Sequence, residues 1–130
     1  MKYSGYYLLF TGIIHNLIGL VMGWPILVSM HQEGWFNVIE GSGQILFDRS
    51  AISWFLITGC FWMMFGWMLQ KAIEQGFVPP ISLAYSFVII GIGVAYLMPM
   101  SGAYLFIIQG IILWFGITNR QKTVLNQQPA

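Results

Sequence analysis

His15 is the side chain in this sequence best placed to do chemistry, because it lies near the middle of a long apolar run. The run extends from Tyr6 to Trp24 and contains the stretch FTGIIHNLIGLVMGW. A neutral imidazole can both donate and accept a hydrogen bond near pH 7, and an ionisable residue inside an apolar span is a candidate functional site. Proton handling, metal binding and ligand binding are therefore the roles to weigh for His15.

A metal site is disfavoured by the spacing of the histidines. His15 and His31 are the two histidines of the chain, and a continuous helix would separate them by about 24 Å at 1.5 Å per residue. We predict no metal site and no cofactor. Haem coordination by His15, alone or with a methionine, is the alternative that remains.

Further polar side chains are expected at the depth of His15. Asn16 is its neighbour, Thr58 and Cys60 lie near the middle of the second apolar run, and Gln109 lies near the middle of the fourth. Unpaired polar groups are costly in hydrocarbon, so these side chains should face inward and bond to one another, to water or to a ligand. The layer is interpreted either as a structural network or as a ligand-binding site.

A second group of candidate residues lies at the start of the second apolar run. Asp48 and Arg49 come just before the run, and Trp54 lies within its first residues. In one interpretation Asp48 caps a helix and Arg49 contacts lipid headgroups. In the other, the three residues form a polar gate above the His15 layer and bind the headgroup of an amphiphilic ligand.

The composition indicates an integral membrane protein. Charged residues make up 7% of the 130 residues and hydrophobic residues 58%, whereas a soluble domain has about 25% charged residues. We predict an all-α integral membrane fold, a single domain over residues 1–130 with four transmembrane helices in an antiparallel bundle. The expected spans are about residues 5–30, 51–70, 80–98 and 103–118, and the apolar length of the chain is enough for four spans of about 20 residues, the length that crosses a bilayer.

Other patterns refine this layout. Pro25 is expected to kink or end the first helix, and Pro79-Pro80 to start the third. The segment 31–50 is interpreted either as a short helix on the membrane surface or as a plain connecting loop, because it contains several glycines. The polar tail after residue 118 is expected to fray.

Glycines recur at the same spacing in the first two helices. Gly12 and Gly19 follow the pattern TG-x6-G, as do Gly59 and Gly66. Seven residues are nearly two turns, so each pair marks one helix face, and small residues allow helices to approach closely in lipid. We predict packing within the chain, with a dimer face as the alternative, and an inert, buried thiol for Cys60.

The distribution of basic residues predicts an orientation. Lys2, Lys71, Arg120 and Lys122 lie on one side of a four-span layout and Arg49 on the other. The positive-inside rule then places both termini in the cytoplasm. The net charge of +1, without a Lys/Arg cluster, argues against a nucleic-acid partner.

The stretches GIIHNLIGLVMGWP and FDRSAISWFLITG resemble an uncharacterised bacterial family of small four-helix integral membrane proteins, a domain of unknown function. The resemblance covers most of the chain. It implies only the four-helix layout, and it brings no activity with it. Its residues of interest are His15, Asn16, Gly19, Trp24, Asp48, Arg49, Trp54 and Gly59. Separately, we expect a multi-pass protein of the bacterial cytoplasmic (inner) membrane.

Three functions are compatible with these patterns. The leading hypothesis is a non-enzymatic membrane protein that binds a hydrophobic or lipid-like ligand within the bundle, with His15, Asn16 and Gln109 holding its polar end. The second is a small dimeric transporter or channel in which His15 lines the route. The third is a membrane enzyme with His15 as acid or base, its other catalytic groups unknown. The expected partners are membrane lipid, a hydrophobic small molecule and a second copy of the chain.

Overall fold

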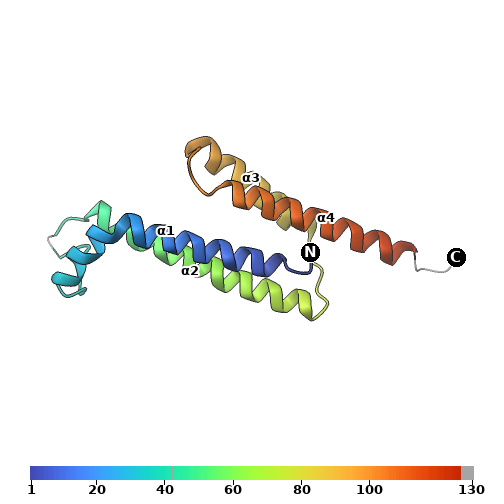
Figure 1. Ribbon diagram of the computed structural model, residues 1–130, viewed down its shortest axis with the longest axis horizontal. Coiled ribbons are helices and arrows are strands. Elements are labelled where there is room, and N and C mark those ends of the chain that lie inside the picture. The colour runs from blue at the N-terminus through green and yellow to red at the C-terminus, as the bar shows by residue number, and fades with distance from the viewer. Residues whose placement is uncertain (42, 127–130) are drawn as a thin grey trace. The chain divides into compact units, whose positions relative to one another are not determined.

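The computed structural model describes residues 1–41 and 43–126 and is all-α, as predicted. It contains the helices α1 (Ser4–Gln32), α2 (Phe47–Glu74), α3 (Ile81–Leu97) and α4 (Tyr104–Asn126), which Figure 1 labels. The chain forms two compact units. Phe10–Met64 make up one unit, and Met1–Leu9 together with Phe65–Ala130 make up the other.

The helix boundaries correct two expectations. Pro25 was expected to kink or end the first helix; it lies inside α1, which continues to Gln32, so the helix does not end there. The prediction of fraying after residue 118 is wrong up to Asn126, the last residue of α4, and residues 127–130 lie outside the described part of the chain. Asp48 lies in the first turn of α2, where the helix dipole favours a carboxylate.

Glycine residues in the left-handed conformation end α1 and α2 in the same way. Gly34 has φ 89° and Gly76 has φ 93°. Beyond α1, the backbone N–H of Trp35 bonds to the carbonyl of Met30 at 3.1 Å, and beyond α2 the N–H of Phe77 bonds to the carbonyl of Ala72 at 2.9 Å. These six-to-one bonds satisfy carbonyls that the helix end would leave unpaired.

The segment between α1 and α2 is a connecting loop, so the surface-helix interpretation is wrong. Turns and bends occupy residues 33–41 and 43–44. Trp35 and Asn37 have positive φ values of 64° and 54°. Residues with a Cβ rarely adopt a positive φ, and a positive φ is incompatible with a right-handed helix.

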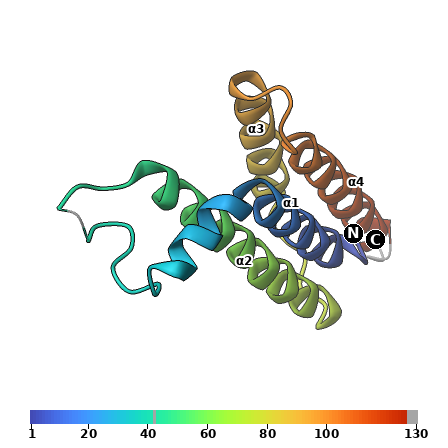
Figure 2. The ribbon, with the colours of Figure 1, turned by 60° about the vertical axis from the view of Figure 1, so that its left-hand side comes forward.

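Glycines bring α1 and α2 together in the Phe10–Met64 unit. A Cβ on Gly12 would lie 2.8 Å from the carbonyl oxygen of Gly59, and a Cβ on Gly19 would lie 2.7 Å from the Phe55 ring. The pairing of Gly12 with Gly59 and of Gly19 with Phe55 shows that the two helices are antiparallel here. Figure 2 shows them side by side.

In the unit of Met1–Leu9 and Phe65–Ala130, glycines also lie in close contact with the backbone of a neighbouring helix. A Cβ on Gly66 would lie 2.5 Å from the backbone nitrogen of Leu9. A Cβ on Gly110 of α4 would lie 2.7 Å from the carbonyl oxygen of Ala84 in α3. The spacing of the glycines in α1 and α2 therefore predicted packing within the chain correctly, while Gly93 has nothing within 4 Å.

Two helices, α1 and α2, are long and apolar enough to cross a membrane, among the residues that the structure describes. Helix α3 is apolar but has 17 residues. The four-helix, all-α part of the predicted fold is thus confirmed, with two candidate membrane spans.

Replacing Gly66 by Ala should destabilise the protein, because the added methyl group would press on the backbone of Leu9 rather than on a flexible side chain. Overpacking of this kind costs about 1–3 kcal/mol. Thermal unfolding of the purified protein in detergent would measure the loss. Gly93→Ala is the matched control, since its surroundings are open, and equal stability of the two variants would contradict the assignment.

Candidate functional site

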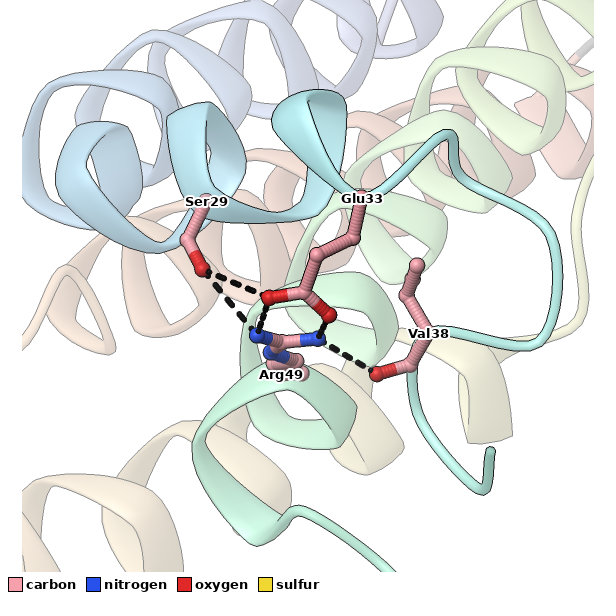
Figure 3. Close-up of polar contacts among 4 residues, drawn as sticks. All are labelled: Ser29, Glu33, Val38 and Arg49. Atoms are coloured by element: carbon pink, nitrogen blue, oxygen red, sulfur yellow. Dashed lines mark hydrogen bonds and ion pairs between the residues drawn. The ribbon is translucent and has the colours of Figure 1, made fainter. Parts of the chain in front are cut away.

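Arg49 joins the ends of α1 and α2, as Figure 3 shows. Its guanidinium forms a two-pronged ion pair with Glu33, with N···O distances of 2.6 and 2.5 Å. The same group donates to the backbone carbonyl of Val38 at 2.8 Å and to the hydroxyl of Ser29 at 3.0 Å. We call Ser29, Glu33, Val38 and Arg49 the loop latch.

The latch changes the interpretation of Arg49. Its two terminal nitrogens carry four N–H groups, and the four bonds to Glu33, Val38 and Ser29 occupy all of them. The Arg49 side chain is only 12% exposed. Arg49 therefore holds the loop in place, and the prediction that it contacts ligand or lipid headgroups is not supported by this geometry.

The latch also fixes the charge state of Glu33. The hydrogen bonds from Arg49 hold the pKa of the Glu33 carboxyl below its ordinary value of 4.5. Bidentate pairing with arginine favours the ionised carboxylate. At neutral pH the two opposite charges compensate each other.

Beside the latch, an open pocket of about 530 Å³ lies between the loop and the first turns of α2. We call it the loop pocket. Trp54 of the predicted gate lines it, whereas Asp48 and Arg49 do not. Its lining residues are Met30, Trp35, Asn37, Val38, Ile39, Glu40, Ile45, Ser50, Ser53, Trp54 and Ile57.

The floor of the loop pocket is apolar and firmly packed. Met30, Val38 and Ile52 form a buried cluster under the loop. The Trp35 indole N–H donates to Nδ1 of His31 at 3.0 Å, which ties one wall of the pocket to the last turn of α1. The pocket thus combines an apolar base with polar groups from the loop and from α2.

His15 and Asn16 contact α2, as the predicted polar layer required. The His15 ring stacks on Phe55 with centroids 3.7 Å apart, and the Trp62 ring lies 4.5 Å away. Nε2 of His15 lies 3.0 Å from the carbonyl oxygen of Phe55. A carbonyl can only accept, so Nε2 carries the hydrogen. Asn16 donates to the Cys60 sulfur at 3.5 Å.

Gly59 explains how these side chains reach α2. A Cβ at this position would collide with the side-chain oxygen of Asn16 and would lie 3.0 Å from the His15 ring. Thr58 takes no part, because its hydroxyl donates to the carbonyl of Trp54 in the preceding turn, at 2.7 Å. Cys60 is exposed, so the prediction of a buried thiol is wrong.

Gln109 lies in the unit of Met1–Leu9 and Phe65–Ala130, and its side chain bonds to Ser4 there. Its side-chain nitrogen donates to the Ser4 hydroxyl at 2.9 Å and to the Ser4 carbonyl at 3.1 Å. Ser4 begins α1, eleven residues before His15, or about 16 Å along a straight helix. The sequence analysis placed Gln109 near the middle of the fourth span. Helix α4 begins at Tyr104 and extends to Asn126, so Gln109 lies near its start.

Gln70 also bonds to the N-terminal segment of the chain, and the sequence analysis missed it. Its side-chain oxygen accepts from the backbone N–H of Tyr6 at 3.4 Å, and its nitrogen donates to the carbonyl of Lys2 at 2.9 Å. Gln70 thus supplies a partner for the Tyr6 N–H in the first turn of α1, which the helix itself leaves unpaired, and for the Lys2 carbonyl just before the helix. The sole signal was a polar residue at the edge of an apolar run, followed by Lys71 and Glu74.

Glu33 was also missed, although the sequence held a usable signal. Ser29 and Glu33 lie one turn apart, and the Ser29 hydroxyl donates to Glu33 at 3.3 Å. Arg49 is the lone basic residue in the predicted external segment, so an acidic partner was to be expected. Pairing with Glu33 rather than Glu40 depends on the loop turns, which the sequence pattern did not define.

The latch predicts a pH dependence of the loop. Because the folded-state pKa of Glu33 is lowered, its stabilising effect is present above the unfolded value and disappears as the pH falls through the lower, folded value. The amide protection factors of residues 33–41, which are exchange rates corrected for the intrinsic pH dependence of exchange, should therefore fall below about pH 4. Glu33→Gln should exchange faster at neutral pH and lack the acid step, and an unchanged step in this variant would refute the role of Glu33.

The comparisons with known proteins place the chain in one family. No curated protein and no solved structure matches it. Residues 1–120 match a family model described as a family of unknown function (DUF6463). This match covers most of the chain, all of α1, α2 and α3 and most of α4. The chain therefore belongs to the DUF6463 family of unknown function.

Proposed function

We propose that this protein is a small integral membrane protein of the bacterial cytoplasmic membrane, with four spans, that binds a lipid-like amphiphile in the loop pocket. The observation that carries the membrane assignment is the distribution of apolar and polar side chains. Gln70 is 2% exposed and Gln109 is fully buried, whereas Val21 is 78% and Ile89 69% exposed. Water would oppose this arrangement, and a lipid environment favours it.

All four helices have such outward apolar side chains. They include Leu17 and Val21 on α1, Phe61 on α2, Ile89 on α3 and Ile111 on α4. Their exposure supports lipid contact for α3 and α4 as well as for the two longer candidate spans. The 17 residues of α3 extend about 26 Å, and bilayers accommodate a mismatch of a few ångström at modest cost.

The charges support an orientation with both termini in the cytoplasm. Lys71 lies at the end of α2, and Arg120 lies in the last part of α4. On a four-span layout these basic residues share one side with Lys2 and Lys122, while the loop latch faces the other. Short cytoplasmic segments carry an excess of basic residues.

The loop pocket has the form expected for an amphiphile site. Asn37 and Glu40 come from the loop, beyond the end of α1, whereas Ile57 lies about 15 Å along α2. The lining therefore extends from the level of the lipid headgroups towards the hydrocarbon. Binding sites of this kind combine apolar walls with a few polar groups.

The His15 layer gives weaker support to the alternative functions. A transport route or an acid–base centre at His15 needs a ring nitrogen that can exchange protons. One of the two ring nitrogens, Nε2, is already engaged in a hydrogen bond to the Phe55 carbonyl. The ring is also covered by Phe55 and Trp62. We therefore assign His15 and Asn16 to the packing of α1 on α2, and the ligand to the loop pocket.

Native mass spectrometry of the gently extracted protein would test this assignment. We expect a retained amphiphile on the wild type and about tenfold less on Trp54→Ala, which corresponds to a loss of about 1.4 kcal/mol. Trp67→Ala is the matched control, because Trp67 is also an exposed tryptophan of α2 but does not line the pocket. His15→Phe keeps a stacking ring and should retain the amphiphile. If only His15→Phe lost the amphiphile, the binding site would lie near His15 between the helices and not in the loop pocket.

Labelling of single cysteines would test the four spans. In a Cys60→Ser background, Phe36→Cys and Met100→Cys place thiols at positions that are 92% and 99% exposed. Both should react with a membrane-impermeant maleimide on intact cells, whereas Gln75→Cys should react only after permeabilisation. If Met100→Cys also required permeabilisation, only α1 and α2 would cross the membrane.

A further inference from the structure

We infer that the amphiphile of the loop pocket carries a cationic amine headgroup. This inference rests on the proposed amphiphile-binding function and adds the chemistry of the headgroup. The charge of the lining is the first argument. Glu40 is the one charged residue among the described residues that line the pocket, so the lining is negative when this carboxylate is ionised.

The loop latch keeps the nearest basic residue from cancelling this charge. Arg49 forms its ion pair with Glu33 and uses its remaining terminal N–H groups on Val38 and Ser29. An anionic headgroup would therefore find no available guanidinium at the latch and would be repelled by Glu40. A cationic headgroup finds complementary charge.

The aromatic lining supports the same conclusion. Trp35 and Trp54 both border the pocket, and they are 51% and 64% exposed. Tryptophan faces attract ammonium groups, more strongly where water is partly removed. The hydrogen bond from Trp35 to His31 limits the movement of this ring, so less ordering is needed on binding.

The neutral polar groups of the lining suit an ammonium donor. Asn37, Ser50 and Ser53 offer side-chain oxygens that can accept N–H hydrogen bonds. Ser50 and Ser53 lie in the first two turns of α2, between Glu40 on the loop and the apolar Ile57. An amine near Glu40 would thus have its alkyl chain directed along the apolar part of the pocket.

The test compares two probes of equal chain length, dodecylamine, which is protonated at pH 7, and dodecanol, on the full-length protein in maltoside micelles. Native mass spectrometry would count the adducts of each across a titration. The wild type should bind dodecylammonium more tightly than dodecanol. Glu40→Gln should weaken dodecylammonium binding by about fivefold and leave dodecanol binding unchanged.

Three variants make the outcome decisive. Glu40→Asp keeps the charge and should keep the preference for the amine, while Glu74→Gln removes one negative charge outside the pocket and should change nothing. Trp54→Ala should weaken the binding of both dodecylammonium and dodecanol. If both probes bind the wild type equally and Glu40→Gln has no effect, the headgroup inference is overturned and the proposed function stands. If neither probe binds, the proposed function itself fails.

Discussion

The close approach of the α1 and α2 backbones is the constraint on which the rest of the structure depends. Gly12 meets Gly59 in one unit, and Gly66 meets the backbone of Leu9 in the other. In the membrane environment that we propose, lipid would provide no hydrophobic drive for helix association, so small residues that permit extensive van der Waals contact would supply the adhesion. Any side chain at these glycines would force the helices apart.

This approach sets the geometry of every site described in the Phe10–Met64 unit. It brings His15 onto Phe55 and Asn16 onto Cys60, because Gly59 leaves room for both side chains. It also fixes the distance between the end of α1 and the start of α2. Arg49 can therefore reach Glu33 and Ser29 at once, and the loop closes over an apolar base.

Much of the helical layout could be predicted from the sequence, because it follows from local patterns. The repeated TG-x6-G spacing identified the contact face of each of the first two helices, and the helix ends at Gly34 and Gly76 follow from glycine conformation. The predicted first span already continued past Pro25 to about residue 30, and α1 does so because a long apolar helix tolerates the loss of the single hydrogen bond that a proline removes.

The candidate site was less predictable because it depends on turns and on partners distant in sequence. Trp54, which was expected to form a gate with Asp48 and Arg49, lines the loop pocket without them. The pocket wall includes Asn37 and Glu40, whose positions follow from the unusual backbone of the loop. Gln109 was assigned by depth alone, and its partner Ser4 lies 105 positions away. Composition does not encode which polar groups meet at such separations.

On the proposed orientation, the charged residues are distributed unequally between the two sides of the membrane. The basic residues Lys2, Lys71, Arg120 and Lys122 gather on the cytoplasmic side, while the latch compensates Arg49 with Glu33 on the opposite side. Glu40 and Asp48 then leave that side acidic. A cationic headgroup in the proposed site would therefore meet the Glu40 carboxylate without a competing free guanidinium, whereas the proposed orientation depends on the basic residues of the other side.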